Sequence, residues 1–158
     1  MAETYCFDTN IIIFLAQRMP RDVYPGPWNA IEALITEGRA TMPQAVHIEL
    51  GSVEDECQGW AQEHDGFVRP TTLAEIQIVN QITSRYPGWV SPHENAADPF
   101  VIAHAAIFGH VVVTDEGRKG PGTLPHNLKI PNVADEFGVE CLTFVALARR
   151  EGWRFTSG

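Results

Sequence analysis

A short apolar run near the N-terminus ends abruptly in a carboxylate, and this feature constrains the fold more than any other. Residues 5–7 are apolar and stop at Asp8, and a longer apolar stretch covers residues 11–15. The first run is typical of a buried β-strand, whereas the second predicts a helix with Thr9 or Asn10 as its N-cap. Asp8 is therefore predicted at a strand-to-helix junction, where open parallel sheets bind ligands. It either binds a metal there or only caps the helix.

A second strand-like run also ends in a carboxylate, and an apolar helix leads into it. Residues 99–108 are apolar nearly all round, which is typical of a helix packed in the middle of a domain. Asp98 suits the N-cap of that helix, and Pro99 suits its first turn. Residues 110–114 are rich in β-branched side chains and predict a strand that ends at Asp115. Helix, glycine and strand make half of a parallel α/β unit.

The remaining sequence alternates helical patterns with short apolar runs. Further helices are predicted over 28–37, 43–57, 73–85, 132–137 and 143–151, and a further strand over 139–142. Strands separated by helices imply a mainly parallel sheet with helices on both faces. The predicted fold class is therefore α/β, a three-layer α/β/α sandwich formed by residues 1–158 as a single domain.

This topology brings several acids to one edge of the sheet. Asp8 and Asp115 both follow strands, and the helix that begins at Asp98 runs opposite to the strand after it. The start of that helix therefore lies at the same edge. Glu49 lies beside an apolar stripe on its own helix. It joins the other three acids if that helix packs next to this edge of the sheet. Three polar neighbours are placed to orient a carboxylate or a bound water: Thr9, Asn10 and Thr114.

Carboxylates that converge in this way imply a divalent cation. They repel one another and partly protonate unless a cation is present. Oxygen ligands without His or Cys select Mg²⁺ or Mn²⁺ over zinc. The implied chemistry is phosphodiester hydrolysis, in which one ion activates water and a second stabilises the leaving oxygen. Two alternatives stay open: a catalytically silent binding module, and a phosphatase with Asp8 as nucleophile, which favours a second Asp where this chain has Asn10.

Composition limits the partners and the compartment. The formal net charge of -9 argues against a large basic nucleic-acid-binding surface, although not against nucleic acid held through a metal. Arg118 and Lys119, in a long loop, are either RNA contacts or solvated surface. The three cysteines are far apart in apolar contexts, which favours free thiols in a reducing compartment. The chain carries neither a signal peptide nor an apolar run of roughly 20 residues, so we expect a cytoplasmic protein without membrane contact.

Four segments resemble, in order, the acidic motifs of PIN-domain nucleases. Residues 7–12 are similar to the first motif of that family and residues 43–50 to the second. Residues 97–105 and 111–115 resemble the third and fourth motifs, so the resemblance covers roughly the first 115 residues. The remainder, including residues 129–133, resembles a PIN-like family that carries a domain-of-unknown-function label.

The resemblance implies a PIN-like fold and a metal-dependent ribonuclease, with Asp8, Glu49, Asp98 and Asp115 as ligands of Mg²⁺ or Mn²⁺. It further implies a VapC-like toxin of a type II toxin–antitoxin pair, which acts on RNA, is inhibited by an antitoxin protein and is compatible with a homodimer. One departure concerns the fourth motif, which usually continues into an Asp-x-Asp-Phe-like segment but here reads Asp115-Glu116-Gly117. Glu116 is therefore a candidate to share or replace the role of Asp115.

Overall fold

The computed structural model describes residues 2–92 and 94–156, and its centre is a five-stranded sheet in which every strand pair is parallel. The strands lie in the order β3-β2-β1-β4-β5. Their bounds are β1 (Tyr5–Phe7), β2 (Ala40–Pro43), β3 (Val68–Arg69), β4 (Val111–Val113) and β5 (Cys141–Leu142). The predicted α/β class and parallel sheet are confirmed.

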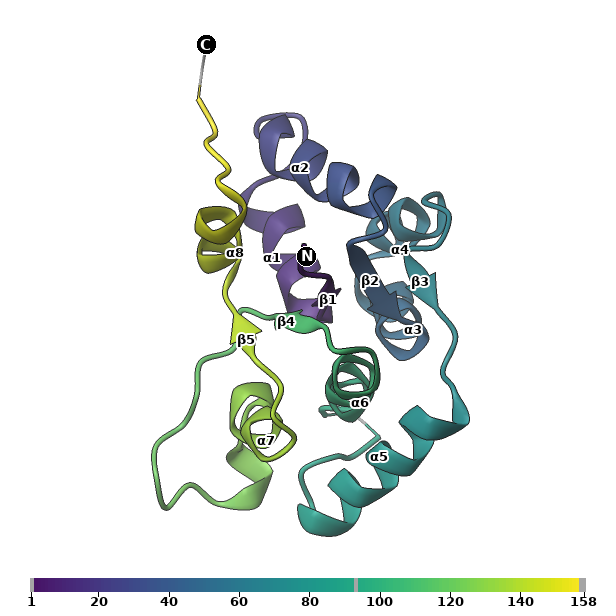
Figure 1. Ribbon diagram of the computed structural model, residues 1–158, viewed down its shortest axis with the longest axis vertical. Coiled ribbons are helices and arrows are strands. Elements are labelled where there is room, and N and C mark those ends of the chain that lie inside the picture. The colour runs from purple at the N-terminus through teal and green to yellow at the C-terminus, as the bar shows by residue number, and fades with distance from the viewer. Residues whose placement is uncertain (1, 93, 157–158) are drawn as a thin grey trace.

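Helices cover both faces of this sheet. Their bounds are α1 (Thr9–Arg18), α2 (Pro25–Thr36), α3 (Gln44–Val53), α4 (Asp55–Gln62), α5 (Leu73–Arg85), α6 (Asp98–Phe108), α7 (Ile130–Glu136) and α8 (Phe144–Glu151). Figure 1 shows α1, α2 and α8 above the sheet and α5, α6 and α7 below it. None of the helices formed by the described residues has the length and hydrophobicity needed to cross a bilayer.

Strand order creates a crevice beside the central strand. The chain adds β2 and then β3 on one side of β1, and it then crosses through α5 and α6 to place β4 on the other side. Such a reversal leaves an opening at the carboxyl ends of the two strands that flank it. α6 packs against β1, β2 and β4 beneath this opening, which explains why it is apolar nearly all round.

Two of the predicted boundaries are wrong. The helix predicted over 43–57 is two helices, because the chain turns out of helical geometry at Glu54, where φ is -147°. Pro43 ends β2 instead of opening the helix. β2 and β3 were not predicted as strands, since neither carries the run of β-branched residues that marks β4.

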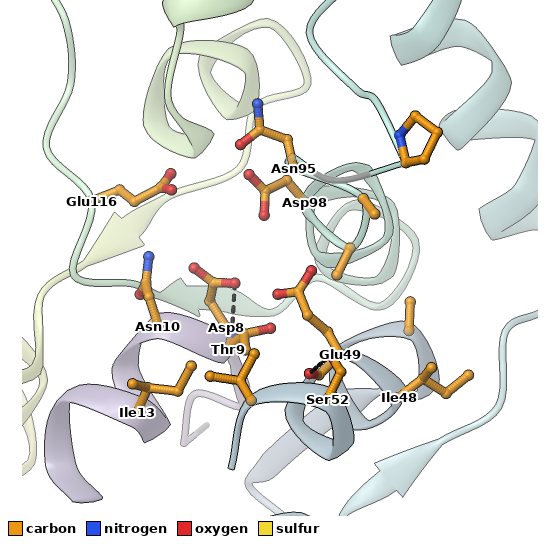
Figure 2. A pocket seen from close by; sticks show the side chains of 15 residues that line it. Asp8, Thr9, Asn10, Ile13, Ile48, Glu49, Ser52, Asn95, Asp98 and Glu116 are labelled. Atoms are coloured by element: carbon orange, nitrogen blue, oxygen red, sulfur yellow. Dashed lines mark hydrogen bonds between the residues drawn. The ribbon is translucent and has the colours of Figure 1, made fainter. Parts of the chain in front are cut away.

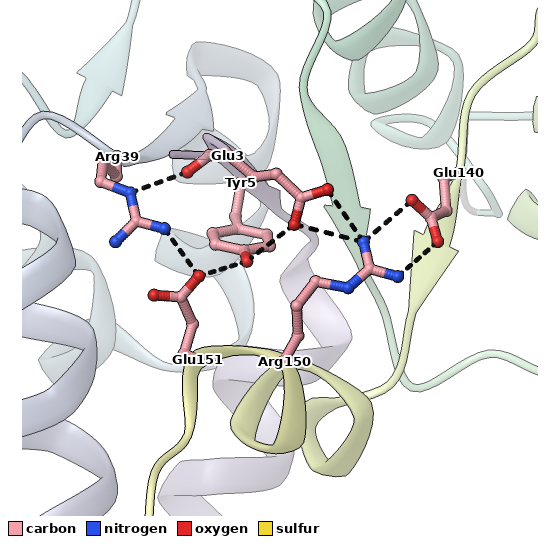
Figure 3. A network of polar contacts seen from close by, with 6 residues as sticks. All are labelled: Glu3, Tyr5, Arg39, Glu140, Arg150 and Glu151. Atoms are coloured by element: carbon pink, nitrogen blue, oxygen red, sulfur yellow. Dashed lines mark hydrogen bonds and ion pairs between the residues drawn. The ribbon is translucent and has the colours of Figure 1, made fainter. Parts of the chain in front are cut away.

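A polar network ties α8 to the start of the sheet (Figure 3). It contains six side chains: Glu3, Tyr5, Arg39, Glu140, Arg150 and Glu151. Glu151 accepts a hydrogen bond from the Tyr5 hydroxyl and another from Arg39, at 2.6 Å for the latter. The Arg39 bond holds the pKa of Glu151 below its ordinary value. The ionised carboxylate is therefore the form that the folded state stabilises.

Glu151→Gln is expected to lower the free energy of unfolding by about 1–2 kcal/mol at neutral pH, because two partly buried donors lose a charged acceptor. A lowered folded pKa gives stability that is present above the unfolded value near about 4.3 and is lost as the pH falls through the folded value. The difference between variant and wild type should therefore vanish in acid. Chemical denaturation across pH measures it. Glu136→Gln is the control, since its pair with Arg85 is exposed; an equal loss there would contradict the assignment.

Candidate functional site

A pocket of about 750 Å³ opens in the crevice at the carboxyl edge of the sheet. Its walls come from the start of α1, the exposed side of α3, the loop before α6 and the segment after β4. Four acids line it: Asp8, Glu49, Asp98 and Glu116. Figure 2 shows their carboxylates pointing toward one space from these separate parts of the chain. The structure thus brings together three of the four predicted ligands, with Glu116 as the fourth acid.

Asp8 both caps α1 and faces the pocket. One carboxylate oxygen accepts a hydrogen bond of 2.7 Å from the Thr9 N–H, and the other accepts one of 2.9 Å from the Thr114 hydroxyl. The side chain is buried, and burial, together with the charges of Glu116 and Glu49, raises its pKa. The two hydrogen bonds act in the opposite direction. The capping and ligand interpretations of Asp8 are therefore compatible in the structure.

Asp98 was predicted as the N-cap of α6, and this prediction is wrong. Asp98 is the first residue of the helix, and Ala97 is the N-cap. Its carboxylate turns into the pocket instead of back toward the helix (Figure 2). The side chain is 7% exposed, and burial raises its pKa, followed by the charge of Asp8. Within residues 2–92 and 94–156, no hydrogen-bond donor is bound to this carboxylate. Asp98 is therefore a buried acid whose carboxylate no described hydrogen bond stabilises.

Glu49 and Glu116 complete the acidic lining from opposite sides. Glu49 projects from α3, as its place beside the apolar stripe predicted. One oxygen of Glu116 accepts a 2.9 Å hydrogen bond from the Ile130 N–H at the start of α7. The same residue therefore lines the pocket and anchors the helix that follows the long loop.

Asp115 does not line the pocket and is exposed. Phe7 in β1 pairs with Val113 in β4, so the next residues along the two strands, Asp8 and Thr114, lie opposite each other. Side chains alternate across a strand, so the residue after Thr114 leaves this side and Glu116 returns to it. Of the two candidates for the fourth ligand, Glu116 therefore lines the pocket in this structure and Asp115 does not.

The predicted supporting residues surround Asp8. Thr114 donates to Asp8, and its oxygen accepts from the Glu116 N–H at 3.2 Å. The side-chain oxygen of Asn10 accepts from the Asp115 N–H at 3.0 Å, which ties α1 to the segment after β4. The Thr9 hydroxyl lines the pocket and, within the described part of the chain, is buried without a hydrogen-bond partner.

The chemistry of these donors fits a hard divalent cation. Among the described lining residues, all the charged groups are carboxylates, and the Thr9 hydroxyl, unpartnered within the same residues, adds a further oxygen. Among residues 2–92 and 94–156, no three His, Cys, Asp or Glu side chains stand close enough to form a ready-made metal site.

The two predicted RNA-contacting residues lie outside the acidic pocket. Arg118 binds both oxygens of Asp135, at 2.8 and 2.7 Å, and Lys119 lines a neighbouring polar pocket. The sequence analysis missed Lys129 as a site residue. Its charge lowers the pKa of Asp98, against the effect of the nearby acids. Only the folding back of the loop brings it there, so no local pattern could have identified it.

Thr114→Val is expected to weaken Mn²⁺ binding by about 10–100-fold, the usual effect of losing a group that orients a ligand. The Thr114 bond lowers the pKa of Asp8, so its removal should shift the pH dependence of Mn²⁺ binding to higher pH. Calorimetric titration across pH measures both effects. Thr41→Val removes a buried hydroxyl that bonds the Tyr5 carbonyl on β1, outside the pocket; a similar pH shift in this variant would refute the role of Thr114.

Comparison with known proteins places the chain in a family without naming an activity. No curated protein matches it. The resemblance to PIN-domain nucleases therefore stays a prediction. A family described as a domain of unknown function, DUF4411, matches residues 5–155, which is nearly the whole sequence, and the chain belongs to this family.

Proposed function

We propose that this protein is a Mg²⁺- or Mn²⁺-dependent endoribonuclease that hydrolyses phosphodiester bonds. One observation carries the proposal: Asp8, Glu49, Asp98 and Glu116 line one pocket at the carboxyl edge of a parallel sheet. Within the described ranges, no lysine, arginine or histidine lines that pocket. A concentration of buried negative charge without a basic partner is costly, so its presence supports a cation as the natural ligand.

The chain's own residues would hold such an ion and position the groups around it. A bound Mg²⁺ or Mn²⁺ would supply an activated water and would stabilise charge on the leaving oxygen. Thr114 and the Thr9 N–H fix both oxygens of Asp8 in place. Among the described residues, Asp98 and the buried Thr9 hydroxyl have no such bonds, which leaves their oxygens without a donor in the absence of an ion. This arrangement supports Asp8 as a fixed ligand more than as a free nucleophile of a phosphatase.

The wall of the same pocket supports a protein partner. Ile48 and Val53, on α3, are 63% and 58% exposed and line the pocket beside the acids. Large apolar side chains at the rim of a charged site are a common feature of protein interaction sites. We therefore extend the proposal to the toxin of a type II toxin–antitoxin pair in the cytoplasm, with an antitoxin that covers this pocket.

Cleavage of RNA tests the catalytic proposal directly. Purified wild type is incubated with a mixed pool of structured and single-stranded RNA, with Mn²⁺, with EDTA, and with Mn²⁺ restored after EDTA. We expect cleavage only when Mn²⁺ is present and none with Asp8→Asn, which keeps the capping acceptor for α1. Cleavage that persists in EDTA or in the variant would reject the mechanism. Binding of RNA without cleavage would instead favour the silent module.

Growth tests the proposed toxin role. Expression of the wild-type chain should arrest bacterial growth, and Asp8→Asn should not. Co-expression of the product of a small adjacent reading frame should restore growth. Unimpaired growth with active, soluble wild-type protein would contradict the toxin role and would leave the nuclease proposal standing.

A further inference from the structure

A second pocket lies next to the acidic one and has the opposite character. It has a volume of about 810 Å³ and is lined mainly by residues 119–129 of the long loop after β4. Asn95 lines both pockets, so they meet at this residue. The two pockets therefore lie on either side of this residue.

The second pocket gathers cationic side chains in an acidic protein. Lys119, Lys129 and His126 line it, and Glu94 is the one acid among its described lining residues. Within residues 2–92 and 94–156, neither lysine has a carboxylate within salt-bridge distance. Arg118, by contrast, is held by Asp135. In a chain of net charge -9, two lysines in one pocket, neither of them in a salt bridge with a described carboxylate, favour an anionic ligand.

The loop that carries these lysines is closed by specific bonds. The side-chain oxygen of Asn132 accepts from the N–H groups of Lys119 and Lys129, at 3.0 and 3.1 Å. The Asn132 amide donates back to the Lys119 carbonyl at 2.9 Å. The Trp89 indole donates to the Leu128 carbonyl at 2.8 Å. These contacts fix the backbones of both lysines where the loop closes, so the two side chains start from neighbouring fixed points of the loop.

Asn95, at the junction of the pockets, has an unusual backbone. Its φ is 58°, a value that residues other than glycine rarely adopt. Its side-chain amide donates to the Trp89 carbonyl at 2.6 Å, and its own carbonyl accepts from the Asp98 N–H. Trp89 is thus bonded to both Asn95 and the lysine loop. Strained residues held in this way often lie at functional sites.

We propose that the second pocket binds a backbone phosphate of the RNA, one next to the phosphate held in the acidic pocket. This inference rests on the proposed nuclease function. Lysine is a compact point charge suited to phosphate oxygens, and the side chains of Thr123 and Asn127 add hydrogen-bonding groups. The acidic pocket needs a cation to accept phosphate, whereas the second pocket does not. The substrate is thereby held by two contacts, one through a bound cation and one directly through lysine.

The salt dependence of RNA binding tests this subsite without cleavage. A fluorescent single-stranded oligoribonucleotide is titrated in EDTA over a series of salt concentrations, using wild type and Lys119→Gln/Lys129→Gln. The logarithm of the affinity falls as the logarithm of the salt concentration rises. Each lost phosphate contact should make this negative slope shallower by about 0.7. The control is Arg18→Gln/Arg149→Gln, which removes the same charge from exposed positions on α1 and α8. Its slope should equal that of wild type.

The outcomes separate this inference from the proposed function. An unchanged slope in a folded lysine variant, or an equal drop in the control, would overturn the subsite even if wild type cleaves RNA. A drop confined to the lysine variant would support the subsite even if the cleavage test fails, in which case the chain binds RNA without cutting it. Matching melting temperatures establish that both variants are folded.

Discussion

Asp98→Asn is expected to abolish metal-dependent RNA cleavage and, at the same time, to make the metal-free protein more stable. Loss of a group that merely orients a metal ligand costs about 10–100-fold, so loss of the ligand itself should lower the rate by at least about 100-fold. The stability gain has a separate origin. Burial and the charge of Asp8 raise the pKa of Asp98 in the folded chain, so its ionised form is disfavoured by folding.

The sign of this effect follows from linkage. An acid whose pKa is raised in the folded state costs no stability below its unfolded value of about 3.9. Above that pH the cost grows as the pH rises toward the folded value, and it is complete once the pH has passed that value. Asn carries no charge at any pH. We therefore expect the variant to gain about 1–2 kcal/mol near neutral pH, a rise of roughly 2–4 °C in melting temperature per kcal/mol.

Thermal melts with and without Mn²⁺ measure both effects of this substitution. Mn²⁺ should stabilise wild type and should have little effect on Asp98→Asn, which starts from a higher melting temperature. Asp22→Asn, at an exposed position in the α1–α2 loop, is the control and should follow wild type in each condition. A variant that is less stable than wild type without metal, yet still responds to Mn²⁺, would show that Asp98 has a purely structural role.

Glu116→Gln and Asp115→Asn should differ sharply, although the two residues are neighbours. Glu116 lines the pocket, whereas Asp115 is exposed outside it. Gln retains an oxygen that can accept from the Ile130 N–H, so the start of α7 should be preserved. We expect Glu116→Gln to weaken Mn²⁺ binding by at least about tenfold and to reduce cleavage accordingly. Asp115→Asn should remain close to wild type.

Calorimetric Mn²⁺ titration and cleavage rates for the two variants, measured side by side, test this contrast. Each variant removes one formal charge, so the general effect of charge on metal attraction is the same in both. If Asp115→Asn were the more damaging change, the fourth ligand would be Asp115 after all, and the segment after β4 would have to rearrange when the ion binds.

The sequence was sufficient to predict the acids whose position depends on topology alone. Asp8 follows the central strand, and Asp98 starts the helix that returns to the same edge, so the order of elements places both. The fourth acid depends on register and alternation at the end of β4, which a shift of one residue reverses. The sequence pattern could not fix that register. Asp115 was therefore predicted in a position that Glu116 occupies.

Contacts between side chains far apart in the sequence could not be predicted, for a different reason. Glu75 on α5 and His104 on α6 form a buried pair at 2.8 Å. Glu75 also belongs to the capping box at Thr72, which local spacing does reveal. Its second partner lies 29 residues away, and only the packing of α5 against α6 defines that contact.

The dual contact of Glu116 has a consequence for the energetics of ligand binding. The Glu116 carboxylate lies in the acidic pocket and also holds the end of the loop that forms the second pocket. A ligand that moves Glu116 from one side must alter the loop on the other. Thermodynamic reciprocity then requires that metal and polynucleotide change each other's affinity by the same factor. In the proposed nuclease, binding of the RNA and binding of the metal ion would then be cooperative.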